Sequence, residues 1–213
     1  MSEKILTPEE IVSEFQALLG DGLQSSRVQL RAEGLKTRKS QEVWLTLDKD
    51  LLNDALAKLA TFDYPHLAVI SGVDVGEAVE LIYHFFIYYG RGRGNEIKVS
   101  MTVSLPKDDL TVDTISGIIP GAVFSEREKQ EFLGIDVIGI PDSRRLFIPD
   151  HFPEGLYPWR KDETGITIEH ELAKELWRVG RDDAEAKLAA RAAANASEAD
   201  EGMSSAASAK EEK

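Results

Sequence analysis

The most constraining feature of this 213-residue chain is the stretch from residue 124 to residue 162. Charged, proline and aromatic residues alternate there without the period of a helix or a strand, and five of the eight prolines of the chain lie between residues 120 and 158. Such a stretch cannot build a core by itself, and a long loop attached to a compact protein is usually functional. We therefore expect it to lie on the surface of another protein.

The residues before this stretch carry regular patterns. Thr7-Pro8-Glu9-Glu10 predicts a helix that begins with a capping box, and Gly20 predicts its end. Two strands joined by a polar loop at 36–41 follow, and Asp48 is expected to cap a second helix with one apolar face. Of three further strands, the last alternates apolar and polar residues, which is typical of a sheet with one buried face. The predicted strands are 28–31, 43–47, 67–73, 78–89 and 97–105.

The order helix–strand–strand–helix–strand–strand–strand predicts an α+β fold with a largely antiparallel sheet. We expect this domain to span residues 1–110. An interface helix and an extended arm should occupy 111–165, and a C-terminal helix with a tail rich in Ala, Ser and Glu should occupy 166–213. Within the middle part we expect a short helix at 112–118, a second helix at 121–133 that Gly134 ends, and irregular chain at 135–162.

Composition excludes several classes of function. The chain has no Cys, so it offers no thiolate to an iron–sulfur cluster, no disulfide and no Cys nucleophile. Its net charge of −13 argues against nucleic acid or an anionic membrane as the main partner. The N-terminus lacks the pattern of a signal peptide, and the most apolar run, Leu81–Tyr89, is far shorter than the roughly 20 residues of a membrane span. We expect a soluble, cytoplasmic chain that reaches a membrane only through partner proteins.

Three groups of residues could carry chemistry. Gly90–Asn95 alternates glycine with arginine and could cradle a phosphate, but it lies between two strands with no helix after it, which favours a hairpin turn with exposed arginines. The histidines lack the spacing of a helical zinc site, and His84, in an apolar strand, is expected to be a satisfied core residue. Three glutamates beside Arg127 are either acid–base residues in a cleft or, as we favour, a charged helix face with local ion pairs. The histidines are His66, His84, His151 and His170, and the glutamates are Glu126, Glu128 and Glu131.

Two pairs of basic residues point to an interface. Arg144-Arg145 follows Pro141-Asp142, and Arg160-Lys161 follows Pro158-Trp159. Arginine forks pair with carboxylates through two parallel hydrogen bonds, and aromatic and arginine side chains are the residues that interface hot spots favour. The alternative is a solvated basic loop on an acidic protein.

The same stretch contains three motifs in a fixed order. They are Gly-Ala-Val-Phe-Ser-Glu-Arg-Glu at 121–128 with Gly134-Ile135, then Pro-Asp-Ser-Arg-Arg-Leu at 141–146, then Tyr-Pro-Trp-Arg-Lys-Asp at 157–162. In order and spacing they resemble the 30 kDa subunit family of respiratory complex I and its relatives, over roughly residues 5–165. Phe124 stands where that family usually has Trp, and Ile140 stands where complex I members often have His. The Pro-Glu-Gly-Leu-Tyr-Pro motif at 153–158 is closer to energy-converting membrane-bound [NiFe] hydrogenases and related ferredoxin-using complexes.

The resemblance implies a non-catalytic structural subunit. Members of this family bind no cofactor and supply no catalytic residue; iron–sulfur clusters, and a [NiFe] centre where there is one, belong to partner subunits. They pack on the hydrogenase-like large subunit near the iron–sulfur small subunit, in the peripheral arm on the cytoplasmic face of the membrane. The residues expected at the subunit interface are Glu126, Arg127, Glu128, Asp142, Arg144, Arg145, Tyr157, Trp159, Arg160, Lys161 and Asp162.

Other functions stay open at this point. The complex could instead reduce a quinone or another acceptor, as a complex I-type dehydrogenase does. From a different class, the chain could be a free-standing enzyme that binds an anion at Gly90–Gly94 or Arg144–Arg145, or a soluble adaptor that uses its acidic surface and Ala-rich tail. The free-standing enzyme needs a cluster of catalytic groups that the sequence does not offer, and the adaptor leaves the 124–162 stretch unexplained.

Overall fold

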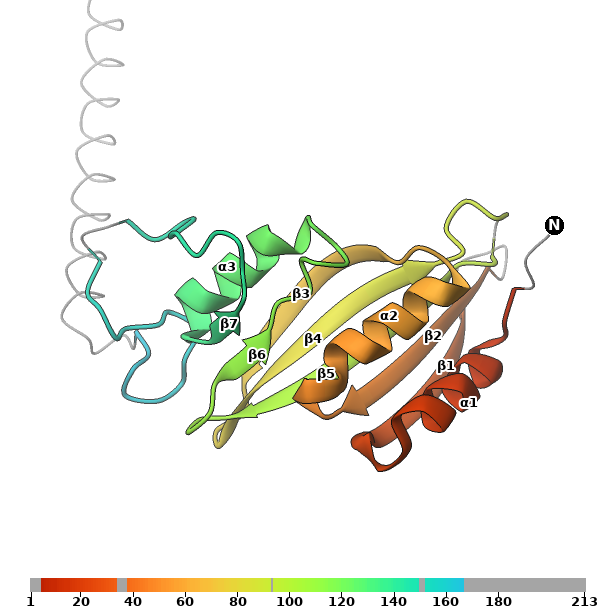
Figure 1. Ribbon diagram of the computed structural model, residues 1–213, viewed down its shortest axis with the longest axis horizontal. Coiled ribbons are helices and arrows are strands. Elements are labelled where there is room, and N and C mark those ends of the chain that lie inside the picture. Colours follow the sequence, from red (N-terminus) through yellow and green to blue (C-terminus); the bar gives the residue numbers. More distant parts are fainter. Residues whose placement is uncertain (1–4, 34–37, 93, 150–151, 167–213) are drawn as a thin grey trace, which may run out of the picture. The chain divides into compact units, whose positions relative to one another are not determined.

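A five-stranded sheet is the central element of the structure, a computed structural model that describes residues 5–33, 38–92, 94–149 and 152–166 (Figure 1). The spatial order of its strands is β1–β2–β5–β4–β3. All neighbours are antiparallel except β2 and β5, which are parallel. The predicted α+β fold with a largely antiparallel sheet is therefore confirmed. The strands are β1 (Leu23–Glu33), β2 (Arg38–Leu47), β3 (His66–Asp74), β4 (Ala78–Ile87) and β5 (Ile97–Pro106).

One face of this sheet carries the core. In the register, Leu45 lies opposite Met101, Met101 opposite Tyr83, and Tyr83 opposite Ile70, and all four side chains are buried. Side chains two positions apart along a strand share a face, so the odd-numbered apolar residues of β2, β4 and β5 all point to this side. The alternation predicted for residues 97–105 is confirmed.

Three helices cover that face. Figure 1 shows α1 (Pro8–Leu19) and α2 (Leu52–Phe62) across the sheet. The third helix, α3 (Ala122–Leu133), packs on β3, where its Leu133 side chain approaches Gly72 on the same face as Ile70. The predicted capping box of α1 is present, since the Thr7 hydroxyl accepts from the Glu10 amide at 3.2 Å and the Glu10 carboxylate accepts from the Thr7 amide at 2.8 Å.

Asp48 does not cap the second helix. A short 3₁₀ turn, η2 (Lys49–Leu51), separates it from α2, and its carboxylate accepts instead from the side-chain amide of Gln24 at 2.5 Å. The predicted apolar face of α2 is correct, because its leucines at 52, 56 and 59 and Ala55 are buried. β2 also begins earlier than expected: it starts at Arg38, within the segment predicted to be a loop.

The segment after the sheet differs from its prediction in two places. The short helix expected at 112–118 is wrong, because Thr111–Asp113 forms strand β6. The chain expected to be irregular from residue 135 begins with strand β7 (Asp136–Ile138), which pairs in parallel with β6. Val112 and Val137 lie opposite each other in this pair and both are buried. The helix predicted at 121–133 is confirmed as α3, and Gly134 ends it in a left-handed conformation.

The glycine-rich segment at residues 90–94 is a turn between β4 and β5, as predicted. Gly90, Gly92 and Gly94 all have positive φ, and Arg91 pairs with Asp63 at 2.8 Å. Within the described ranges, no helix is long and apolar enough to cross a bilayer. The predicted C-terminal tail lies outside the described residues.

Candidate functional site

The most unusual element of the structure is α3, because it buries charge. Glu126, Arg127 and Lys129 are each less than a tenth exposed. A buried charge is costly unless hydrogen bonds or an opposite charge compensate it, so each of these residues needs an identifiable partner. The partners are the loop before the helix and the segment that follows it. We call residues 135–165 the arm.

Glu126 holds the loop that connects β6 to α3. Its two carboxylate oxygens accept from the Thr114 hydroxyl at 2.7 Å and from the Ile115 amide at 2.8 Å. Burial raises the pKa of Glu126, and these two hydrogen bonds act in the opposite direction. Burial, together with the nearby Glu126, also raises the pKa of Tyr83 in the sheet below. Glu126 is thus a structural anchor and not part of a surface ion pair.

Arg127 and Glu131, one helical turn apart, hold the arm by its backbone. The Arg127 guanidinium donates to the carbonyl oxygens of Arg144 at 2.6 Å and Arg145 at 2.9 Å. The Glu131 carboxylate accepts from three consecutive amides, those of residues 146, 147 and 148, the last two at 2.9 Å. A cation therefore binds carbonyls and an anion binds amides within residues 144–148.

The same stretch contains a surface ion pair. Asp142 accepts from the Arg144 guanidinium through two parallel bonds of 2.9 and 2.8 Å and lies 3.4 Å from Arg127. Side-chain and backbone hydrogen bonds from Arg144, helped by Arg127, lower the pKa of Asp142 well below its usual range. Arg144 remains 84% exposed. Arg145 turns back onto the arm and donates to the carbonyl oxygens of Pro149 at 2.8 Å and Phe152 at 3.3 Å.

Three aromatic rings form a row between α3 and the arm. Phe132 lies in the middle: its ring centroid is 4.5 Å from that of Trp159 and 6.1 Å from that of Phe147. The Lys129 ammonium sits 4.8 Å from the centre of the Trp159 ring and pairs with Glu128. Phe147 is 62% exposed and Trp159 is 41% exposed. Large apolar side chains gathered this way on a surface commonly mark a protein contact.

The end of α3 fits closely against the arm. Gly134 has a φ of +67°, and a Cβ at this position would lie 2.5 Å from the Tyr157 ring. The Trp159 amide donates to the Phe132 carbonyl at 2.9 Å, which fixes the return of the arm along the helix. Gly134 is therefore required both by its left-handed backbone and by the approach of Tyr157.

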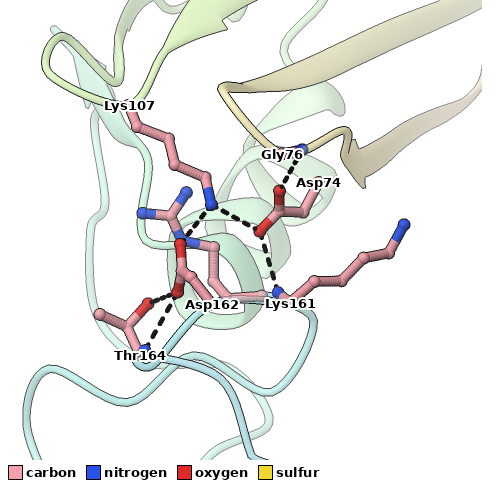
Figure 2. A network of polar contacts seen from close by, with 7 residues as sticks. Asp74, Gly76, Lys107, Lys161, Asp162 and Thr164 are labelled. Atoms are coloured by element: carbon pink, nitrogen blue, oxygen red, sulfur yellow. Dashed lines mark hydrogen bonds and ion pairs between the residues drawn. The ribbon is translucent and has the colours of Figure 1, made fainter.

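A second anchor joins the distal end of the arm to the sheet (Figure 2). Asp74, whose side chain is fully buried, accepts from the amides of Gly76 and Lys161, both at 2.9 Å, and lies 3.2 Å from the Lys107 ammonium. Lys107 also donates to Asp162, which accepts from Thr164 as well. We call Asp74, Lys107 and Asp162 the latch.

The latch carboxylates are held in their charged form. Burial alone would raise the pKa of each, but hydrogen bonds reverse the sign and lower it. For Asp74 the donors are two backbone amides and Lys107; for Asp162 they are Lys107 and Thr164. Burial of a carboxylate is compatible with ionisation when several donors point at it, which is the situation here.

Two side chains near the arm keep polar atoms without a partner. The Arg160 side chain is only 7% exposed, and its Nε and Nη1 atoms have no hydrogen-bond acceptor; the nearest carboxylate, that of Asp162, is 3.9 Å from Nε. The Oε1 atom of Gln130 is likewise buried and unpaired, and Gln130 lines a hollow of about 430 Å³ between α3 and the arm. Unsatisfied buried donors and acceptors are costly and uncommon in folded proteins.

The structure brings the residues expected at the interface together around α3 and the arm, but most of them also bind their own chain. Glu126, Arg127 and Asp162 are internal anchors, and Lys161 contributes its backbone amide to Asp74. Among the described residues, the local ion pairs expected for the α3 glutamates are present only between Glu128 and Lys129. Sequence reasoning missed the roles of Glu131, Asp74 and Lys107, whose partners lie far along the chain.

The other sequence candidates lie elsewhere. His84 is half-buried on the sheet face away from the helices, where it pairs with the Ser100 hydroxyl at 2.9 Å, so its expected place in the core is wrong although it has a partner. In the described part of the chain, no three His, Asp or Glu residues are placed to hold a metal ion.

Comparison with known proteins identifies a matching family and several similar proteins. The family model "Respiratory-chain NADH dehydrogenase, 30 Kd subunit" matches residues 45–168. Membrane-bound hydrogenase subunit beta of Pyrococcus furiosus is 33% identical over 138 residues, which cover 63% of this chain and 79% of the relative. Hydrogenase-4 component G of Escherichia coli is 31% identical over 124 residues, 57% of this chain but only 22% of the relative.

A solved structure shares the fold. A chain of the membrane-bound sulfane sulfur reductase, an archaeal respiratory membrane complex, superposes with a TM-score of 0.57 over 72% of this chain and 84% of that chain, at 23% identity.

Proposed function

The chain belongs to the respiratory-chain NADH dehydrogenase 30 kDa subunit family, and we propose that it is a non-catalytic structural subunit of a membrane-bound, complex I-related oxidoreductase. The complex is of the energy-converting hydrogenase type. This subunit packs on the hydrogenase-like large subunit, beside the iron–sulfur small subunit, in the peripheral part on the cytoplasmic side. Iron–sulfur clusters and a nickel–iron centre are carried by those partners.

The observation that carries this proposal is the way the arm is presented. Its backbone is fixed in the middle by Arg127 and Glu131 and near its end by the latch, so docking a partner needs little further ordering of these parts of the chain. The side chains that the fixed arm leaves exposed include Phe147, Trp159 and Arg144, and aromatic and arginine residues are the kind that dominates interface energies.

Buried polar groups without partners lie beneath the same surface. Arg160 keeps two donors without acceptors, and Gln130 keeps an acceptor without a donor beside the hollow. The unpaired Arg160 atoms are closed off from solvent in the free chain, so a carboxylate or carbonyl of a partner subunit reaches them only if the arm moves on docking.

A non-catalytic role agrees with how the charged groups are used. Glu126 and Glu131 bind amides of their own chain, and Arg127 binds two carbonyls. Groups held in this way position a loop and are not placed to exchange protons with a substrate.

The relatives support a large neighbouring subunit. The first of them is named as a subunit of a membrane-bound hydrogenase. In hydrogenase-4 component G the matching segment is a small part of a much longer chain. A domain that is fused to a larger one in a relative is expected to lie against a corresponding neighbour when it is a separate chain.

The proposal can be tested by tagging this chain, purifying it, and measuring how much of the large subunit purifies with it. We expect the chain purified from detergent-solubilised membranes of its source to carry the hydrogenase-like large subunit, identified by mass spectrometry. Phe147→Ala should lower that recovery about tenfold or more, the size of a hot-spot loss. Tyr89→Ala is the matched control, since Tyr89 is 74% exposed on the β4–β5 turn, away from the arm. Equal recovery with both variants, or a partner set without the large subunit, would contradict the proposal.

A further inference from the structure

The sheet face that points away from the helices carries a continuous row of side chains across all five strands. In the register, Arg27 lies opposite Trp44, Trp44 opposite Ser100, Ser100 opposite His84, and His84 opposite Val69. These positions alternate with the buried core positions, so their side chains point to the other face. Within the described residues all three long helices pack on the core face; in the row itself Arg27 and Val69 are exposed, Trp44 and His84 are half-buried, and Ser100 is fully buried.

Trp44 is the centre of the row and lies between two cations. The Arg27 guanidinium carbon is 5.5 Å from the centre of its ring, the Lys98 ammonium is 5.0 Å from it, and the His84 ring meets it edge-on at 6.0 Å. Its indole N–H donates to the Glu42 carboxylate at 3.2 Å. An aromatic side chain flanked by Arg and Lys is held in one orientation by cation–π attraction.

Arg27 and Lys98 have no carboxylate oxygen within 4 Å, whereas most other cations of the described chain do. Glu42 faces Lys98 in the register but takes the Trp44 indole. The chain has 38 acidic residues and a net charge of −13, yet around Trp44 two cations accompany the single carboxylate of Glu42, which leaves this part of the face with a net positive charge.

The β3–β4 part of this face carries apolar side chains, whereas the rest of the face is mostly polar, with Glu80, Thr102 and Ser104 among its residues. Val69 is 44% exposed and Val73 is 37% exposed, while Ile82 and Phe86 of β4 are half-buried on the same side. A face meant for water normally carries polar residues at these positions. We call Arg27, Trp44, Val69, Val73, Ile82, His84, Phe86 and Lys98 the open face.

We propose that the open face binds a second protein subunit, one whose contacting surface presents carboxylates opposite Arg27 and Lys98 around a central apolar contact with Trp44. This proposal goes beyond the arm interface, because α3 and the open face lie on opposite sides of the sheet, but it rests on the proposed function for its setting in a complex. Charge complementarity selects an acidic protein surface. A two-fold dimer centred on Trp44 would bring the cations of one copy, Arg27 and Lys98, close to those of the other copy, which disfavours self-association in that arrangement.

Zero-length cross-linking of the purified complex tests the contact. A carbodiimide joins an amine to a carboxylate only when the two are in direct contact. We expect a link from Lys98 to an Asp or Glu of another subunit, and its loss in Lys98→Arg, which keeps the charge and removes the amine. A link from Lys98 only to Glu42, or to a second copy of this chain, would overturn the proposal.

Charge variants separate this proposal from the proposed function. Arg27→Glu should lower recovery of the cross-linked subunit about tenfold relative to the wild-type chain. Arg27→Lys, which keeps the positive charge, should retain most of the wild-type recovery. Circular dichroism of the free variant confirms that it is folded. Should Arg27→Glu leave every subunit in place while Phe147→Ala still removes the large subunit, the open face is not an interface and the proposed function stands. If no partner purifies with the wild-type chain, the proposed function itself fails.

Discussion

At the scale of single residues, Glu131 holds the arm through one carboxylate, which accepts hydrogen bonds from three successive backbone amides. Glu131→Gln replaces a charged acceptor by a neutral amide whose NH₂ group faces donors. Hydrogen bonds to charged groups contribute about 1.5–3 kcal/mol, so a loss of that order in the free energy of unfolding is expected in urea titrations. Glu77→Gln, on an exposed turn, is the control and should change it little. A loss of equal size in both variants would contradict this role for Glu131.

Gly134 is constrained twice, by its φ of +67° and by the Tyr157 ring. Gly134→Ala should lower the free energy of unfolding by at least about 1–2 kcal/mol, the usual cost of a left-handed non-glycine residue, with steric conflict added to it. Gly121→Ala at the other end of α3 meets no atom within 4 Å and has an ordinary φ of −67°, so it should have little effect. The two variants can be compared by thermal denaturation. Similar midpoints would show that the arm does not pack on Gly134.

At the scale of elements, the latch makes attachment of the arm depend on pH. The pKa values of Asp74 and Asp162 are lowered in the folded chain from 3.8, so their contribution to stability is present above pH about 4 and is lost as the pH falls through the folded values. Asp162→Asn should therefore be less stable than the wild-type chain at pH 7, and the difference should shrink at pH 3. Other carboxylates whose pKa is lowered, such as that of Asp142, are present in both proteins, so their contributions cancel when the stabilities of the two are subtracted. A difference that is equal at both pH values would mean that Asp162 acts by shape alone.

The elements that sequence patterns predicted are those with local signals. The capping box of Thr7 and Glu10 predicts α1, and the alternation of apolar and polar residues at 97–105 predicts β5. Strands β6 and β7 have three residues each and pair across α3, so neither has enough length to show a period. Asp48 is a good cap by type, but the intervening turn and Gln24 decide its partner.

The sequence indicated which residue types make up the candidate site, but not which atoms those residues contact. Arg127, Arg144 and Arg160 were expected to serve an interface, and the structure adds that Arg127 first binds its own arm. Glu131 was noticed only as one of three helix glutamates and Asp74 not at all, because their partners lie 15 to 17 and 87 residues away in sequence and such pairing is set by the fold.

At the scale of the whole molecule, the sheet separates two surfaces with different chemistry. On the helix side, the fixed arm exposes Phe147, Trp159 and Arg144. On the other side, Trp44 lies between two cations that lack carboxylate partners. A chain with one core and two such surfaces is suited to hold other subunits in place.

The central claim, that this subunit acts in assembly and not in turnover, is tested most directly by the activity of assembled complex that contains Phe147→Ala. Hydrogen evolution with reduced ferredoxin should be measured per mole of purified complex, alongside the yield of complex from membranes. We predict a lower yield, about tenfold or more, with the rate per complex unchanged. A normal yield with a lost rate would contradict the account, because Phe147 and the arm would then take part in the reaction.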